Sequence, residues 1–250
     1  MANETVFSNK GTDYAIGRPG YAPAAVEFIV RELLPPGGKV ADIGSGTGKF
    51  SKDLITRCID TYCVEPNADM RSQAESLFRD DPHFFSIAAP AEHTTLPDHC
   101  VDMVTAASAF HWFDTDAFRA ECRRILKPGG YVVLLMNSRT YTDEFTRRQH
   151  EICVETCPGF ISLHHGLDKT LPKLDQFFGD SLQYAEFDHP LEYTRTNFIN
   201  RCLSSSYAPA NAPDGSNPYT DRIAALMDEF GMTGSFVLSN VTNMHYGKLD

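Results

Sequence analysis

The sequence predicts a doubly wound α/β fold, in which helices cover both faces of a mostly parallel sheet. Between residues 38 and 136, short apolar runs alternate with amphipathic helical patterns, and the links between them are short. The run 101–106 is apolar throughout, as is typical of a strand buried on both faces of a parallel sheet. A chain of 250 residues with 42% hydrophobic content has room for one large domain of this class.

Local signals place the elements in order along the chain. Pro23 lies near the start of the first helix and Pro35 stops it, because proline suits the first helical turn and breaks a helix interior. Asn67 and Asp114 precede helical patterns and are expected to cap them. We expect strands at residues 39–43, 59–64, 84–88, 101–106, 131–136, 182–193 and 235–244. We expect helices at residues 23–34, 48–57, 68–78, 115–126, 145–153, 196–203 and 223–230, and irregular or weakly helical chain at 157–178.

Composition narrows the partners and the compartment. The net charge of −11, with 33 acidic and 22 basic residues, disfavours nucleic acid, because binding phosphates needs a basic face. No run of 18 apolar residues and no leader of the secretory kind is present, so we expect a cytoplasmic protein without a membrane partner. The cysteines are odd in number and too widely spaced for zinc or redox motifs, so we expect reduced thiols and no metal. They stand at positions 58, 63, 100, 122, 153, 157 and 202.

A glycine-rich turn connects the first expected strand to its helix. Residues 40–50 read VADIGSGTGKF, in which Gly44, Gly46 and Gly48 follow Asp42 in the pattern Asp-x-Gly-x-Gly-x-Gly. Backbone without Cβ atoms lets a ligand approach closely, and glycine adopts positive φ readily. The dinucleotide fingerprint needs a sixth-position glycine where Lys49 stands, and a P-loop spacing is also missing. The turn therefore predicts a different nucleotide-type site, the alternative being a tight turn without a ligand.

A carboxylate follows the second expected strand. Glu65 comes 21 residues after Gly44. A carboxylate at this position can accept hydrogen bonds from both hydroxyls of a ribose, because it offers two acceptor oxygens. The alternative is a solvated glutamate at the end of a strand.

Four separated segments together resemble the class I S-adenosylmethionine-dependent methyltransferases. They are the glycine turn, Glu65-Pro66, the loop Ala91-Glu92 to Leu96-Pro97, and LKPGG at 126–130. The resemblance implies a Rossmann-like sheet of seven strands in the order 3-2-1-4-5-7-6 with strand 7 antiparallel, S-adenosylmethionine as cofactor and S-adenosylhomocysteine as product.

Within that family, we expect a single domain, 1–250. It divides into an N-terminal arm and helix (1–37), a cofactor-binding core (38–136), an inserted substrate cover (137–180) and C-terminal strands and helices (181–250). The insertion is assigned as the cover because long connections in such sheets usually carry function.

The N-terminal arm and segment 109–114, AFHWFD, are similar to a narrower branch, the trans-aconitate methyltransferases. The resemblance implies that the three glycines border the methionine part, that Glu65 binds the ribose and that Tyr14 and Arg18 close over the methionine end. Pro90 stands where the wider family often has aspartate, which weakens the expected adenine contact. The expected cofactor-binding residues are Tyr14, Arg18, Asp42, Gly44, Ser45, Gly46, Thr47, Gly48, Glu65, Pro66, Met70, Ala91, Glu92, Ala107 and Ser108.

The expected reaction moves a methyl group to a small molecule, most plausibly to an oxygen of a carboxylate or hydroxyl. A carboxylate is ionised at neutral pH and needs no base, whereas a hydroxyl acceptor would use His111, whose alternative role is to hold its loop. Trp112 is expected to form a substrate wall or, alternatively, part of the core. Arg201 is interpreted as part of a solvated face, with an anion-binding role as the alternative.

Two other functions remain open from the sequence. One is a catalytically silent protein that binds S-adenosylmethionine or S-adenosylhomocysteine. The other is an NAD-dependent oxidoreductase, which Lys49 in the glycine turn disfavours. The oligomeric state and the acceptor are not specified by the pattern.

Overall fold

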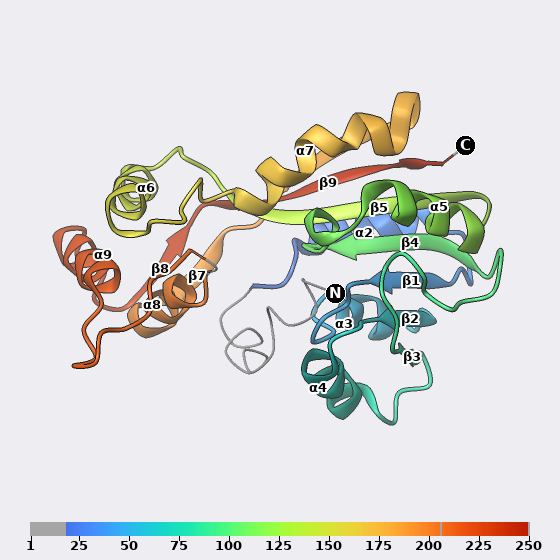
Figure 1. Ribbon diagram of the computed structural model, residues 1–250, viewed down its shortest axis with the longest axis horizontal. Helices are drawn as coiled ribbons and strands as arrows, with labels where there is room; N and C mark the ends of the chain where they lie inside the picture. Colours follow the sequence, from blue (N-terminus) through green and yellow to red (C-terminus); the bar gives the residue numbers. More distant parts are fainter. Residues whose placement is uncertain (1–18, 206, 250) are drawn as a thin grey trace.

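The computed structural model of the chain describes residues 19–205 and 207–249 and contains a large twisted sheet (Figure 1). Its strand order is β3-β2-β1-β4-β5-β9-β6. The first five of these strands run parallel, and β9 is antiparallel to both β5 and β6. This confirms the expected seven-stranded order, with β9 in the place of strand 7. The strands are β1 (Val40–Ile43), β2 (Thr61–Val64), β3 (Phe84–Ile87), β4 (Val101–Ala107), β5 (Leu126–Arg139), β6 (Gln183–Asp188), β7 (Leu191–Thr194), β8 (Ser235–Leu238) and β9 (Asn240–Lys248).

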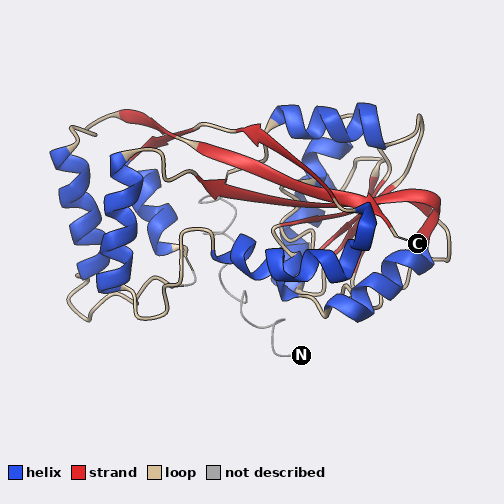
Figure 2. Cartoon of the chain, turned by 90° about the horizontal axis from the view of Figure 1, so that it is seen from above, coloured by secondary structure: helices blue, strands red, loops and turns tan. Residues whose placement is uncertain are grey.

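Helices cover both faces of the sheet, as a doubly wound fold requires (Figure 2). Apolar residues of α5 and α7 pack on one face, and those of α2, its π-helical continuation η1 and α3 pack on the other. The helices are α2 (Pro23–Phe28), η1 (Ile29–Leu33), α3 (Ser51–Ile55), α4 (Ala68–Phe78), the short η2 (Phe110–Trp112), α5 (Thr115–Ile125), α6 (Glu144–Thr156), α7 (His165–Phe178), the short η3 (Gly179–Ser181), α8 (Arg195–Leu203) and α9 (Pro218–Glu229). Among the helices described, none has the length and apolar character needed to cross a membrane.

Both expected caps are confirmed. The side chain of Asn67 accepts a hydrogen bond from Met70 N at 3.0 Å, and that of Asp114 accepts one from Ala117 N at 3.0 Å. Each cap satisfies an N–H group that the first helical turn leaves without an intrahelical partner. The helices after β2 and β4 therefore begin where the sequence predicts.

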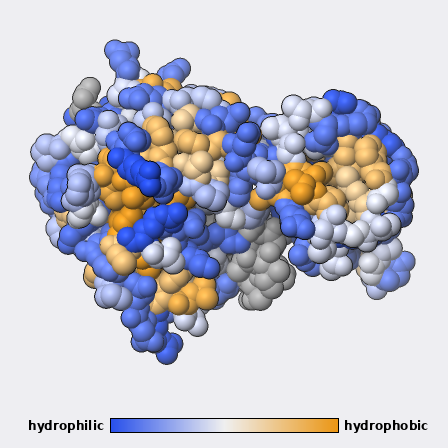
Figure 3. Space-filling model, turned by 180° about the vertical axis from the view of Figure 1, so that it is seen from behind, coloured by the Kyte–Doolittle hydropathy of each residue, from blue (hydrophilic) through white to orange (hydrophobic). Residues whose placement is uncertain are grey.

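A separate cluster of elements forms what we call the small lobe: α6, α8, α9 and the two-stranded sheet β7-β8. Its own apolar core includes the fully buried Phe198 and Tyr219. Figure 3 shows this lobe from behind, standing beside the sheet-containing part across a narrower waist. The segment expected to be the cover is divided, because α6 joins the small lobe whereas α7 packs against the sheet.

Two expected strands and one expected irregular stretch are wrong. Residues 182–193 form β6 and β7 with a break at His189 and Pro190, because proline donates no N–H group to a ladder. Residues 235–244 likewise divide at Ser239 into β8 and the start of β9. Part of 157–178 forms the full helix α7, although it contains Pro172. Its apolar residues Leu174, Phe177 and Phe178 are buried against α5 and the sheet.

Candidate active site

A cavity of about 280 Å³ lies at the carboxyl ends of the parallel strands and extends to the small lobe. Ligands of open α/β sheets bind at this edge. We call the part built by the turns after β1, β2 and β4 the glycine-turn end, and the part built by the end of β5 and the small lobe the small-lobe end. The two ends together contain most of the residues expected from the sequence and many that were not.

Two glycines of the turn line the cavity in left-handed conformations. Gly44 has φ +68° and Gly46 has φ +58°. A Cβ atom on Gly44 would lie 2.7 Å from the Cβ of Ala109, closer than two such atoms approach. The N–H groups of Gly44 and Ser45 both donate to the carbonyl of Val64, at 2.8 and 3.1 Å. The turn is therefore fixed against β2 and leaves bare backbone facing the cavity, which fits the close approach of a ligand.

Gly48 has a different role from the one expected. It also has positive φ, +77°, but it is not among the residues that line the cavity. A Cβ atom there would lie 2.7 Å from Cε2 of Phe78 and 3.2 Å from Cβ of Ala74. Both neighbours belong to α4, so Gly48 allows the turn to pack on that helix. The helix after the turn begins at Ser51 rather than near Gly48.

Asp42 joins three elements behind the turn. Its carboxylate accepts hydrogen bonds from Ser51 Oγ of α3 at 2.6 Å and from Thr105 Oγ1 of β4 at 2.9 Å. Burial raises the pKa of Asp42 from its ordinary value of 3.8 to about 6, although both hydrogen bonds oppose the shift. The residue lines the cavity with its carboxylate oxygens already bound, so it positions the turn.

Glu65 is held by the backbone on either side of it. Its Oε2 accepts from Gly46 N at 2.9 Å, and its Oε1 accepts from Asn67 N at 2.8 Å. Burial raises the pKa of this carboxyl, while the two N–H groups act in the opposite direction. A carboxylate has about four lone-pair sites, so each oxygen of Glu65 retains acceptor capacity toward the cavity. This arrangement suits a pair of vicinal hydroxyls.

The remaining predicted residues at this end lie either in the cavity wall or outside the described residues, and Tyr21, which was not predicted, contacts one of them. Tyr21 Oη donates to Ser108 Oγ at 3.0 Å, and the carboxylate of Glu92 accepts from Asp114 N at 2.9 Å. Tyr14 and Arg18 lie outside the described residues. Ser45, Thr47, Pro66, Met70, Ala91, Glu92, Ala107 and Ser108 all line the cavity, as does Pro90 at the departure from the family pattern.

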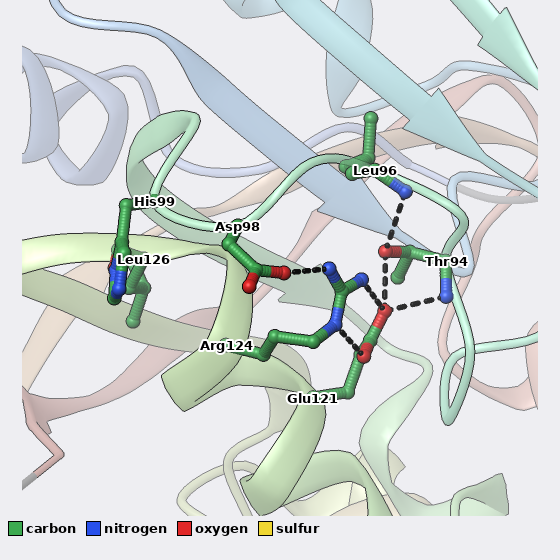
Figure 4. Close-up of polar contacts among 7 residues, drawn as sticks. All are labelled: Thr94, Leu96, Asp98, His99, Glu121, Arg124 and Leu126. Atoms are coloured by element: carbon green, nitrogen blue, oxygen red, sulfur yellow. Dashed lines mark hydrogen bonds and ion pairs between the residues drawn. The ribbon is translucent and has the colours of Figure 1, made fainter.

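The loop that carries Ala91 and Glu92 is held at its far side by a charged network (Figure 4). Glu121 of α5 accepts from Thr94 N at 2.6 Å and from two nitrogens of Arg124, each at 2.8 Å. Arg124 also pairs with Asp98 at 2.6 Å. Burial opposes ionisation, yet these hydrogen bonds lower the pKa of Glu121 to about 2. The loop is therefore anchored to α5 while its other end lines the cavity.

His111 and Trp112 are neighbours with different surroundings. The Trp112 ring lines the cavity, with Lys169 Nζ 5.9 Å from its centroid. His111 is absent from the cavity wall, and its ring packs at Gly166 of α7, where a Cβ atom would lie 3.3 Å from His111 Cε1. The position of Trp112 agrees with a substrate wall, whereas that of His111 gives no support to a role as base.

Sequence reasoning missed most of the small-lobe end. Arg201, interpreted as part of a solvated face, is half-buried and lines the cavity, which corrects that interpretation. A signal was present, because Arg201 lies three residues after Phe198 and directly before Cys202, both buried on one face of α8. The wall at this end is formed by Arg139, Gln149, Leu163, Leu191, Tyr193, Arg201, Cys202, Ser205, Tyr207 and Asn240.

Other cavity residues at the glycine-turn end also escaped prediction. Lys49 and Phe50 follow the last glycine, and Asn67 follows Glu65 and Pro66, so these three lie directly beside expected residues. The further members of this group are Pro19, Tyr21, Ala109, Phe113 and Asn137.

The strand order, the glycine turn after β1 and the acid after β2 together define a class I, S-adenosylmethionine-dependent methyltransferase fold. Residues 41–134 match the family described as the methyltransferase domain. Over residues 41–134 the chain is therefore similar to a methyltransferase domain. The narrower resemblance to trans-aconitate methyltransferases stays a prediction.

Several relatives by sequence are methyltransferases whose names give no substrate. Uncharacterised methyltransferases of Mycobacterium bovis and Mycobacterium tuberculosis are each 34% identical over 140 residues, which make up 56% of this chain and 55% of theirs. A methyltransferase-like protein of Schizosaccharomyces pombe is 29% identical over 161 residues, 62% of each chain. The chain spans about half the length of the first of these relatives.

Solved structures extend the likeness to nearly the whole chain. An inferred type II methyltransferase from Anaeromyxobacter dehalogenans has a TM-score of 0.73 at 26% identity, covering 93% of this chain and 98% of its own. A second structure, from Anabaena variabilis, has a TM-score of 0.65 at 22% identity over 94% of this chain and 99% of its own. The second likeness shows the fold alone.

Proposed function

We propose that this chain binds S-adenosylmethionine at the glycine-turn end and transfers its methyl group to an oxygen of a small molecule held at the small-lobe end. The observation that carries the proposal is the geometry of Glu65. Its carboxylate is fixed by Gly46 N and Asn67 N, faces the cavity beside bare glycine backbone and retains acceptor capacity for two ribose hydroxyls.

The chain's task in such a reaction is to position the reactants and to exclude water. The cofactor, when bound, supplies a methyl group already activated by its sulfonium. An acceptor oxygen forms the new bond to carbon as the sulfur–carbon bond breaks, and the sulfur keeps the electron pair. Before this step, the residues around the cavity would align the acceptor with the methyl group. In well-oriented reactions such alignment lowers the activation barrier by up to roughly 7–11 kcal/mol. Trp112 lines the cavity and would form one wall of the acceptor site.

The surroundings of the cavity favour an acceptor that is already ionised. No histidine is found among the described residues of the cavity wall. The ring of His111, the expected base, packs at α7. A carboxylate, with an ordinary pKa near 4, needs no proton removed at neutral pH. A hydroxyl or carbon acceptor usually needs a positioned base. The absence of a histidine among the described wall residues therefore supports a carboxylate oxygen.

The names of more distant relatives span more than one acceptor atom. A malonyl-[acyl-carrier protein] O-methyltransferase of Methylococcus capsulatus is 30% identical over 109 residues, 38% of its length. A ubiquinone/menaquinone biosynthesis C-methyltransferase of Cupriavidus pinatubonensis is 33% identical over 118 residues, 49% of its length. We therefore base the choice of oxygen on the cavity rather than on these names. We also propose that the small lobe, rather than an insertion at 137–180, forms the acceptor cover.

Calorimetry with S-adenosylhomocysteine tests the proposal. Glu65→Gln should weaken binding by about 10- to 100-fold, since hydrogen bonds to a charged group contribute roughly 1.5–3 kcal/mol. Glu75→Gln on α4 is the matched control, because its half-exposed carboxylate bonds Ser86 and pairs with Arg71 outside the cavity. Equal affinities of the two variants for S-adenosylhomocysteine would contradict a cofactor site at Glu65. Transfer of labelled methyl to small acids separates an enzyme from a silent binding protein.

A further inference from the structure

Two guanidinium groups lie at the small-lobe end of the cavity. Arg139 is the last residue of β5, and Arg201 belongs to α8. Both side chains are half-buried and line the cavity. Arg139 Nη1 donates to the amide oxygen of Gln149, and Arg201 Nη1 donates to Ser205 Oγ at 3.2 Å. Their hydrogen-bonding partners are therefore neutral.

Other arginines of the small lobe are paired differently. Arg148, Arg195 and Arg222 each pair with a carboxylate at the lobe surface. Within residues 19–205 and 207–249, no carboxylate pairs with Arg139 or Arg201. A guanidinium partly removed from water with only neutral partners recovers less of its lost solvation than one paired with a carboxylate. In a chain of net charge −11, two such groups facing one cavity are a specific feature.

The two arginines act on the same region. Arg139 Cζ lies 4.9 Å from the centroid of the Phe198 ring, one turn of α8 from Cys202. Burial raises the pKa of the Cys202 thiol, while the positive charges of both Arg139 and Arg201 act in the opposite direction. Both positive charges therefore act on Cys202, which lines the cavity with them at the small-lobe end.

The carboxylates of the cavity are all at the opposite end. They are Asp42, Glu65 and Glu92. Each already accepts hydrogen bonds there: Asp42 from hydroxyls, and Glu65 and Glu92 from backbone N–H groups. The cavity therefore has a negative wall at its glycine-turn end and a positive wall at its small-lobe end. Among the described residues of the wall, none supplies a negative charge at the small-lobe end, so an anionic ligand would complement the two arginines there.

We propose that Arg139 and Arg201 together bind an anionic group of the methyl acceptor, so that the substrate is a small organic anion carrying a carboxylate or a phosphate ester. Guanidinium groups bind either group through paired, charge-assisted hydrogen bonds. Tyr193, Ser205 and Asn240 contribute neutral polar groups beside them. This inference rests on the proposed function and specifies its substrate class.

Fractionated small molecules test the charge of the acceptor even before the acceptor itself is identified. A small-molecule extract is separated on an anion exchanger, and each fraction is incubated with the full chain and methyl-labelled S-adenosylmethionine. Label incorporated only into the retained, anionic fraction supports the inference. Label only in the unretained fraction would overturn the inference and the choice of a carboxylate acceptor, and would leave cofactor binding and methyl transfer to a small molecule standing. Label in neither fraction would overturn the proposed transfer and this inference with it. Phosphatase treatment of the retained fraction distinguishes a phosphate ester, whose labelling it abolishes, from a carboxylate.

Arginine variants then test the residues with the purified labelled acceptor. Arg139→Gln and Arg201→Gln should each raise the KM for that acceptor by about tenfold or more, because each removes a charge-assisted contact. Their affinity for S-adenosylhomocysteine should stay near that of the unchanged chain. Arg201→Lys should recover part of the loss, since it restores the charge without the planar donor pair.

A surface arginine provides the matched control. Arg222→Gln removes the same charge from an exposed pair with Glu155 on the same lobe, and its KM should not change. The inference fails if Arg139→Gln and Arg201→Gln keep an unchanged KM. It also fails if Arg222→Gln raises KM as much as they do, which would indicate a general effect of charge. Binding of S-adenosylhomocysteine and the melting temperature report whether each variant remains folded.

Discussion

The glycine-turn end and the small-lobe end of the cavity are built in different ways. At the glycine-turn end, the carboxylates already have protein partners, such as Gly46 N and Asn67 N for Glu65. At the small-lobe end, Arg139 of β5 lies over the Phe198 ring and Tyr193 of β7 contacts that ring, whereas Arg201 belongs to the same helix as Phe198. The comparison teaches that one end is fixed by backbone geometry, whereas the other depends on the packing beneath it.

The largest expected effect comes from a substitution that destabilises the small lobe but leaves the glycine-turn end intact. Phe198 is fully buried, and its ring contacts those of Phe145, Tyr193 and Phe236. Phe198→Ala should lower the free energy of unfolding by about 3–5 kcal/mol and remove the surface on which Arg139 rests. Denaturant unfolding and acceptor KM measure these effects. Affinity for S-adenosylhomocysteine should persist, and its parallel loss would show that the two ends are one cooperative unit.

A smaller effect is expected from adding a side chain within the glycine turn. Gly44→Ala combines positive φ with a contact to the short Ala109 side chain, which cannot rotate away. We expect about 2–4 kcal/mol less stability and a strong loss of S-adenosylhomocysteine binding.

Gly48→Ala separates backbone strain from ligand approach. It has similar strain and meets Phe78 outside the cavity, so it should lower stability while retaining more cofactor affinity. If calorimetry shows equal affinity losses for the two alanine variants, the cavity-facing role of Gly44 is refuted.

The third effect is a pH dependence from Asp42. Its pKa is about 6 in the folded chain, above its ordinary value of 3.8. Between these values the folded state holds a proton that the unfolded state has lost, so stability from this group is greatest at low pH and falls as pH rises. In Asp42→Asn this slope should vanish, and the variant should gain up to about 3 kcal/mol on the unchanged chain between pH ~4 and ~7. Urea unfolding across that range measures the difference, and parallel curves would contradict it.

The smallest effect is expected at His111. Because its ring packs at α7, His111→Ala should slow methyl transfer by less than about tenfold, whereas a general base contributes about a hundredfold or more. Initial rates from pH ~5 to ~8 provide the measurement. A larger loss, together with disappearance of a titration in the rate profile, would restore the role as base.

The difference between the two ends also explains what the sequence could predict. The caps Asn67 and Asp114 follow from short-range patterns, whereas the strand order follows from the family resemblance, and the structure agrees with both. Helix α7 was missed because Pro172 normally breaks a helix, and only burial of its apolar face against the sheet reveals it.

Periodic patterns in the sequence do not predict the small-lobe end. The break at Pro190 diverts β7 out of the main sheet to pair with β8, and this pairing brings Tyr193 to the cavity. The spacing of Arg201 from the buried Phe198 and Cys202 indicates the inner side of α8, but it does not show which elements face that side. Partners separated by long stretches of chain decide these positions, so single-sequence patterns cannot supply them.

The pairing of β5 with β9 joins the two lobes by more than a flexible linker. It runs through nine paired positions, from Tyr131 with Lys248 to Arg139 with Asn240, and its last pair lies in the cavity wall. A hydrogen-bonded ribbon resists stretching, so under the proposed function it would fix the distance of Arg139 from the glycine-turn end. We therefore expect acceptors that are too short or too long to span this distance to react poorly, even when they carry the right charge.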